Sequence, residues 1–258
     1  MNQVKSFEAK VKRLGVFKKV YVYEIDGLLI DTGAHSTFKQ LLPFFEQLSV
    51  EQIALTHIHE DHSGNAHWWW KNKQVPIYVH NLSLDYAQER GKYPLYRRLF
   101  WGNRLPFHAE PFPNLIETNN YQFQIIETPG HSDDHISIYE AENGWLFTGD
   151  LYITQKPKLF LSFESIPKTI SSLKKLLDLD IDYIFCAHSG KLANGKQKLQ
   201  DKLDYLLELK NTILDLHQKG YDKNEIVKQL FPKKSILIYL SQNEFSYERA
   251  VESILNND

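Results

Sequence analysis

The chain has 258 residues, of which 42% are hydrophobic and 24% are charged, and its formal net charge at pH 7 is −2. This composition is typical of a soluble globular protein with one large α/β core, or with a core and a small appendage. A single cysteine excludes an internal disulfide, no apolar run approaches membrane-spanning length, and the net charge gives no global field to attract nucleic acid.

Residues 1–8 have mixed polarity and lack the basic segment and apolar core of a signal peptide. Together with the cysteine count, this predicts a cytoplasmic protein without a membrane partner. Local basic pairs such as Arg97-Arg98 remain as the places where nucleic acid could bind.

The chain is predicted to begin its core with a β-hairpin. Residues 19–25 and 28–30 flank Asp26-Gly27, a strong two-residue turn signal. The apolar spacing over residues 37–48 predicts an amphipathic helix in spite of Pro43, and the short apolar strand 53–55 follows.

A dense group of potential metal ligands follows this strand directly. Residues 56–62 contain His57, His59, Asp61 and His62. Imidazole nitrogens and carboxylate oxygens suit zinc and related divalent ions. Because catalytic zinc normally keeps one position open for water, four donors from one loop, with others from elsewhere, indicate two ions rather than one.

The next predicted elements are a helix over residues 63–71 and a strand over residues 76–80. Trp68, Trp69 and Trp70 cannot all face inward on a helix, so at least one indole should line a surface or a cleft. Residues 82–113 are rich in aromatic residues and proline, which fits either a lid over the metal site or a self-packed surface insertion.

Three later strand-like runs each lead to one further candidate ligand. They are residues 123–127 before His131, residues 145–149 before Asp150 and residues 181–187 before His188. A helix is predicted over residues 166–179. From Gly195 to the end the pattern is helical, with a second helix starting near Lys223 behind an Asp222 cap.

This ordered set resembles the metallo-β-lactamase superfamily of binuclear metallohydrolases. The residues that carry the resemblance are His57, His59, Asp61, His62, His131, Asp150 and His188. The resemblance spans about the first three quarters of the chain. It implies an α/β fold, namely an αββα metallo-β-lactamase sandwich forming a catalytic core over residues 1–194, with a C-terminal helical appendage over residues 195–258.

The resemblance also implies roles for these residues. His57, His59 and His131 would hold one ion, Asp61, His62 and His188 would hold the other, and Asp150 would bridge them. Asp61 would in addition exchange a proton while a metal-bridging hydroxide attacks the substrate. The two divalent ions are predicted to be Zn²⁺, with iron or manganese as alternatives.

The predicted activity is hydrolysis of a carbonyl ester, thioester or lactone of a small molecule, because the ligand set is similar to that of glyoxalase II and lactonases. Antibiotic hydrolysis is not expected, since the best-known β-lactamases of this fold usually have cysteine in place of Asp150. Residues 151–156 lack the glycine- and arginine-rich stretch that glyoxalase II carries there, which makes glutathione thioesters a poorer fit.

Two other functions stay open. Residues 128–135 and the helical appendage are similar to the β-lactamase-like endoribonucleases, so a phosphodiesterase or endoribonuclease is the alternative, although no basic groove is evident. A redox binding module like the flavo-diiron proteins would need a flavin domain, for which this chain has no room. The sequence does not predict the oligomeric state.

Several single residues have two interpretations. Asp31 fits either a turn carboxylate or a buried acid beside the metals, and Tyr152 fits either core packing or hydrogen bonding to the substrate. Cys186 is predicted to pack in the core. The remaining histidines have no assigned role: His35, His67, His80, His108, His135 and His217.

Overall fold

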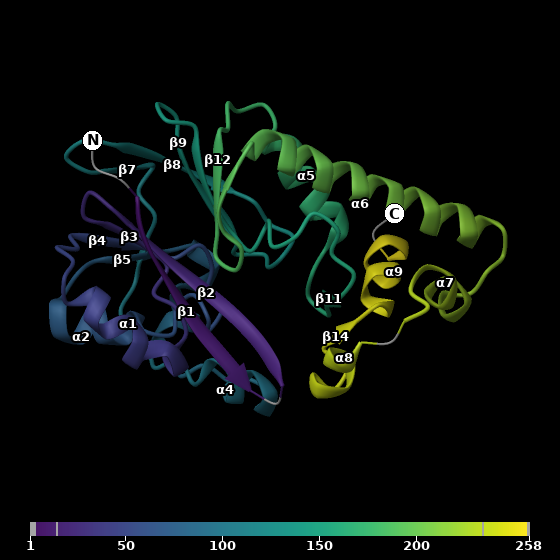
Figure 1. Cartoon of the computed structure of the whole chain (residues 1–258), viewed down its shortest axis with the longest axis horizontal. Helices are drawn as coiled ribbons and strands as arrows, with labels where there is room; N and C mark the ends of the chain where they lie inside the picture. Colours follow the sequence, from purple (N-terminus) through teal and green to yellow (C-terminus); the bar gives the residue numbers. More distant parts are fainter. Residues whose placement is uncertain (1–3, 14, 234, 257–258) are drawn as a thin grey trace.

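The computed structural model describes residues 4–13, 15–233 and 235–256, and these residues form two six-stranded sheets that pack face to face between layers of helices (Figure 1). Helices α1 (Phe38–Phe45) and α2 (Ala66–Lys73) cover the outer face of the first sheet. Helices α5 (Ile166–Leu176) and α6 (Gly195–Gln218) cover the second sheet. The predicted αββα sandwich is confirmed.

The first sheet has the order β1 (Lys5–Arg13), β2 (Val16–Ile25), β3 (Leu28–Ile30), β4 (Gln52–Ala54), β5 (Ile77–Val79) and β6 (Glu110–Pro111). The second has the order β13 (Gly190–Ala193), β12 (Tyr183–Cys186), β10 (Trp145–Gly149), β9 (Ile136–Glu140), β8 (Gln122–Glu127) and β7 (Leu115–Glu117). Strands β3 and β4 are parallel, as are β10 and β12. Because β8 is antiparallel to β9 and β9 to β10, β8 runs in the same direction as β10.

The buried apolar residues of the described chain fall into clusters that match the layers. One lies between the sheets and contains Phe123, Phe147 and Phe185, while the other two lie beneath the helices on either side. Burial of such side chains contributes about 1.5–3 kcal/mol each, so these clusters dominate the stability of the sandwich.

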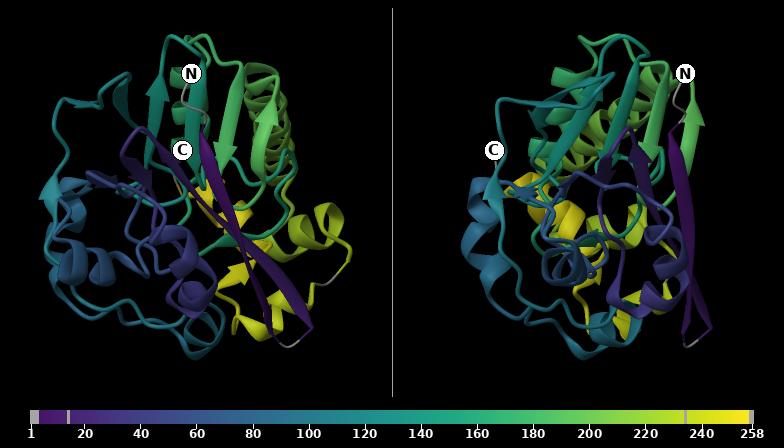
Figure 2. Two further views of the ribbon diagram at one scale, coloured as in Figure 1. Left: turned by 60° about the vertical axis from the view of Figure 1, so that its left-hand side comes forward. Right: turned by 90° about the vertical axis from the view of Figure 1, so that its left-hand side faces the viewer.

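The hairpin of β2 and β3 turns at Asp26-Gly27, as predicted, and both turn residues have positive φ. Strand β1 was not predicted. It pairs with β2 over its whole length, and the two form a long ribbon that extends beyond the rest of the first sheet (Figure 2). The ribbon ends on the same side of the molecule as the C-terminal helices.

The helices differ from the predictions mainly at their ends. Helix α1 is shorter than residues 37–48 and contains Pro43, and α5 ends at Leu176 rather than 179. In α2, Trp69 is 1% exposed whereas Trp68 and Trp70 are half-buried, as the helical geometry requires.

The aromatic segment 82–113 contains two short helices, α3 (Leu84–Gln88) and α4 (Leu95–Trp101). The buried Arg104 side chain donates to the carbonyls of Tyr86 and Ala87, which holds α3 close to the chain that follows α4. The segment is therefore an ordered part of the first half of the molecule.

The C-terminal region contains α6, α7 (Lys223–Leu230), α8 (Ile236–Leu240) and α9 (Glu248–Leu255). Helix α7 begins with the predicted Asp222 cap, which forms a reciprocal capping box with Glu225. The predicted helical C-terminal region is confirmed, and it also contains the short strand β14 (Phe245–Ser246), which pairs with β11 (Phe160–Leu161) of the core. The predicted boundary after residue 194 stays a prediction. No helix in the described part of the chain is long and apolar enough to cross a membrane.

Candidate metal centre

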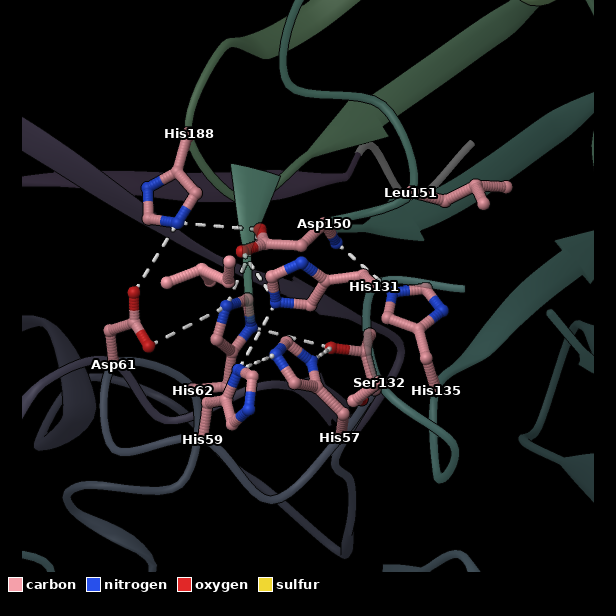
Figure 3. A network of polar contacts seen from close by, with 12 residues as sticks. His57, His59, Asp61, His62, His131, Ser132, His135, Asp150, Leu151 and His188 are labelled. Atoms are coloured by element: carbon pink, nitrogen blue, oxygen red, sulfur yellow. Dashed lines mark hydrogen bonds and ion pairs between the residues drawn. The ribbon is translucent and has the colours of Figure 1, made fainter. Parts of the chain in front are cut away.

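The seven predicted ligands meet at one edge of the sandwich, each after the end of a strand. His131, Asp150 and His188 follow β8, β10 and β12, and the loop with the other four ligands follows β4. Strands β8, β10 and β12 run in one direction within the second sheet, so their carboxyl ends share an edge, and the Ile136 amide donates to the Thr56 carbonyl of the loop from the first sheet. Topology therefore brings residues more than 100 positions apart to the same place (Figure 3).

Close packing against the end of β3 fixes the ligand loop, which is residues 56–62. Asp31 Oδ1 accepts a hydrogen bond from the Thr56 amide at 2.8 Å, and Asn65 donates to the Thr32 carbonyl at 2.7 Å. Gly64 is required here, because a Cβ would lie only 2.4 Å from the backbone nitrogen of His35. Hydrogen bonds between side chains and backbone groups thus hold the loop at both of its ends.

His57, His59 and His131 form the first group of potential donors. One donor atom from each lies within 4.8 Å of the others. His59 Nδ1 is 2.9 Å from His57 Nε2 and 3.1 Å from His131 Nε2. These three rings converge in Figure 3.

Asp61, His62, Asp150 and His188 form the second group, with donor atoms again within 4.8 Å of one another. His188 Nε2 lies 3.4 Å from Asp61 Oδ2 and 3.3 Å from Asp150 Oδ1. Asp150 also reaches the first group, because its Oδ2 is 3.5 Å from His131 Nε2. Each oxygen of this carboxylate therefore faces a different group.

The residues fit divalent metal ions. His62 Nε2 and Asp150 Oδ1 are buried without a hydrogen-bond partner among the described residues, although they lie 3.4 Å apart. Buried polar atoms are nearly always paired, so unpaired donors at the meeting point of histidines and carboxylates indicate a binding site for a cation. Imidazole nitrogen and carboxylate oxygen are the ligand types that zinc, iron and manganese accept.

The electrostatics of the group are consistent with a site for cations. Burial would raise the pKa of Asp61, but His62 and His188 outweigh it and hold that pKa below its ordinary value. Burial would lower the pKa of His188, but Asp150 and Asp61 hold it well above its ordinary value. Burial and the neighbouring His62 lower the pKa of His57. Burial would also raise the pKa of Asp150, but His188 and His62 hold it well below its ordinary value, so both carboxylates stay ionised and attract positive charge.

Further side chains orient the histidine rings from behind. Asp31 Oδ2 accepts a hydrogen bond from His62 Nδ1 at 2.7 Å, and Glu164 Oε1 lies 2.7 Å from His131 Nδ1. The Lys19 carbonyl is 2.6 Å from His188 Nδ1. Such contacts fix the ring so that Nε2 points into the site. Asp31 is 3% exposed, so it is a buried acid as well as an acceptor for the backbone.

Glu164 was not predicted from the sequence, since no local pattern distinguishes it. His135 was left unassigned, and its Nε2 accepts a hydrogen bond from the Asp150 amide at 3.1 Å. It supports the site without joining either group of donors among the described residues. Cys186 and Tyr152 are buried; Tyr152 packs in the core with α5 and α6.

A cavity of about 650 Å³ opens over these groups. Five of the seven candidate ligands line it, namely His59, Asp61, His131, Asp150 and His188. Helix α4 of the aromatic segment also lines it, through residues that include Arg97, Phe100 and Trp101. That segment therefore forms part of the cavity wall, and a closing motion of it stays a prediction.

Several known proteins are similar to this chain. The hydroxyacylglutathione hydrolase of Hahella chejuensis is 30% identical over 188 residues, covering 69% of this chain and 65% of that protein. The atrochrysone carboxyl ACP thioesterase of Aspergillus fumigatus is 24% identical over 187 residues, covering 69% of this chain and 51% of that protein. The chain thus spans about half to two thirds of the length of these relatives.

A solved structure of a metallo-beta-lactamase family protein from Thermus thermophilus superposes with a TM-score of 0.70 at 19% identity, covering 97% of this chain and 93% of that one. This similarity confirms the fold. The family model described as the metallo-beta-lactamase superfamily matches residues 18–188, a range that contains every candidate ligand. The chain belongs to the metallo-beta-lactamase superfamily.

Proposed function

We propose that this protein is a metal-dependent hydrolase with a binuclear site, acting on a carbonyl ester, thioester or lactone of a small molecule. The observation that carries the proposal is the pair of buried donor groups at the floor of one cavity, joined by Asp150. The names of the two curated relatives, a hydroxyacylglutathione hydrolase and a thioesterase, support the same class of reaction.

In this proposal His57, His59 and His131 hold one ion, Asp61, His62 and His188 hold the other, and Asp150 contacts both. Divalent ions bound there would lower the pKa of water and stabilise negative charge that develops on the substrate oxygen. Zn²⁺ fits the donor set best, with iron or manganese as alternatives. A cytoplasmic location stays a prediction.

The chain's own residues would then manage the protons and the substrate. Asp61 lines the cavity and its carboxylate stays ionised, so it can accept a proton from the attacking water and return it to the leaving group. Glu164 and Asp31 keep the rings of His131 and His62 in place.

Metal content and turnover together test the proposal. We expect about two ions per chain by elemental analysis, hydrolysis of thioesters or lactones, and loss of turnover after chelation with recovery on adding Zn²⁺. Bis-p-nitrophenyl phosphate belongs in the same panel, because hydrolysis of it alone would favour the phosphodiesterase. Failure to bind metal after reconstitution would contradict the proposal.

Three substitutions separate metal ligation and proton transfer from folding. His59→Ala should lower the metal content and the turnover, whereas His217→Ala, an exposed histidine near the end of α6, should change neither. Asp61→Asn should lower kcat by about 10²–10⁴-fold, the range typical of losing a general acid or base. Unchanged turnover of Asp61→Asn with full metal occupancy would remove Asp61 from that role.

A further inference from the structure

The cavity over the metal centre has mainly apolar walls. Its side chains come from α4, from the chain after β10, from α6 and from α8. Those that define its apolar part are Phe100, Leu151, Leu159, Phe160, Leu206 and Leu240. Its volume of about 650 Å³ is in the range of cavities that bury a whole small molecule. Apolar walls of this extent favour an apolar occupant.

Part of this wall lies outside the residues that match the family. Leu206 and Leu240 follow residue 188, where the family match ends. The pairing of β14 with β11 holds the C-terminal region against the core, so the wall is a built feature. The C-terminal region therefore adds to an apolar wall that begins within the residues matched to the family.

Positively charged side chains also line the same cavity. Lys18, Lys156 and Lys158 line it, and none of them forms an ion pair with any described residue. Their neighbour Lys19 is different, because its ammonium group lies 2.7 Å from Glu8. Three lining cations without an ion-pair partner among the described residues would attract an anionic group.

The acidic residues that line the cavity belong to the metal centre or contact one of its histidines and do not pair with these lysines. They are Asp61 and Asp150, which belong to the metal centre, and Glu164, which contacts His131. The cavity thus combines the histidines and carboxylates of the metal centre with apolar walls. It also has three lysines, Lys18, Lys156 and Lys158, that form no ion pair with a described residue. A molecule that fits all of these parts has a cleavable carbonyl, a hydrocarbon portion and an anionic portion.

We propose that the substrate is an ester or thioester whose acyl group is a hydrocarbon chain and whose leaving half is anionic. The chain lies against the apolar walls, and the anionic half contacts Lys18, Lys156 and Lys158. This assignment rests on the hydrolase function proposed above. Water supplies the oxygen that bonds to the acyl carbon, the bond to sulfur or oxygen breaks, and a water proton goes to the leaving thiol or alcohol, so no other co-reactant is needed.

Binding of ligands that cannot be hydrolysed tests the assignment without turnover. S-alkyl coenzyme A thioethers with ethyl, octyl and dodecyl chains are titrated by calorimetry into the whole protein, beside neutral S-alkyl N-acetylcysteamine thioethers. We expect Kd to fall by about two- to fourfold per methylene until the cavity is filled. The coenzyme A compounds should bind more tightly than the neutral ones at low salt, and high salt should reduce this difference.

Matched variants assign each effect to its residues. Leu240→Asn should weaken binding of the dodecyl compound by about tenfold or more and leave the ethyl compound unchanged. Ile236→Asn is the control, since Ile236 is on the same helix but is 66% exposed. The double variant Lys156→Ala/Lys158→Ala should remove most of the preference for the anionic compounds, whereas Lys228→Ala on α7 should not.

The possible results separate this assignment from the hydrolase proposal. A Kd that does not depend on chain length, or that rises with it, would overturn the assignment even if short thioesters are hydrolysed. Tight, chain-length-dependent binding without hydrolysis of the matching acyl-coenzyme A by protein with full metal content would support the apolar and anionic contacts, but it would contradict the hydrolase and with it the assignment of this ligand as a substrate.

Discussion

The ion pair between Glu60 and Arg97 connects the ligand loop to α4. Glu60 is 0% exposed and accepts hydrogen bonds from Arg97 Nε at 2.6 Å and from Nη2 at 2.7 Å. Arg97 Nη1 also donates to Glu244, close to β14, at 3.1 Å. One guanidinium therefore holds together three segments that are far apart in the sequence.

Replacing Arg97 by Met would leave the Glu60 carboxylate buried and unpaired. Removing one member of a buried ion pair costs about 3–5 kcal/mol, and Glu60 has no exposure through which water could compensate. The Glu244 side chain is 16% exposed and can hydrate, so its loss of a partner should add little. We expect Arg97→Met to lower the free energy of unfolding by about 3–5 kcal/mol.

Urea unfolding of four proteins measures this effect: the parent, Arg97→Met, Glu60→Met and the double variant. The double variant should lose much less than the sum of the single losses, because it leaves neither charge buried without its partner. Lys219→Met is the control, since its pair with Asp215 is on the surface and should contribute less than about 1 kcal/mol. A loss below about 1 kcal/mol for Arg97→Met, or strictly additive losses in the cycle, would refute the reasoning.

Three further changes test other parts of the structure. Asp31→Asn should weaken metal binding by about 10–100-fold in a chelator competition, because Asp31 orients His62 and Asn tolerates the positive φ of 58° at this position; unchanged affinity would contradict this role. Burial lowers the pKa of Lys202 to about 8, so between pH 8 and the ordinary lysine value of 10.5 the folded state has lost a proton that the unfolded chain retains. The stability of the parent relative to Lys202→Met should therefore rise with pH across this window in urea unfolding, and a constant difference would show that Lys202 titrates normally. Gly149→Ala would place a Cβ 2.7 Å from His135 Nε2 at a φ of +45°, so it should lower the melting temperature and the metal content together; a fully stable variant would show that this edge of the site can relax.

Local patterns predicted most of the elements that carry the site. The short apolar runs before His57, His131, Asp150 and His188 are strands in the structure, and all the predicted ligands lie in the two donor groups. These strands and ligands could be predicted because each pattern is formed by residues that are neighbours in the sequence. Strand β1 has the alternation of a strand, because Phe7, Ala9 and Val11 are separated by polar residues. It was not predicted because the N-terminal residues were considered only for their mixed composition.

The order of the strands and the chemical type of the donor groups could be predicted from the sequence, and the resemblance to the family added the sandwich. Three features became visible only in the folded structure: Glu164 orients His131, Glu60 pairs with Arg97, and apolar and basic side chains line the same cavity. Glu164 is 33 positions from its partner, and Arg97 is 37 positions from Glu60. Hydrogen bonds and cavities of this kind depend on the relative placement of elements that fold apart in the chain, and no local periodicity encodes that placement.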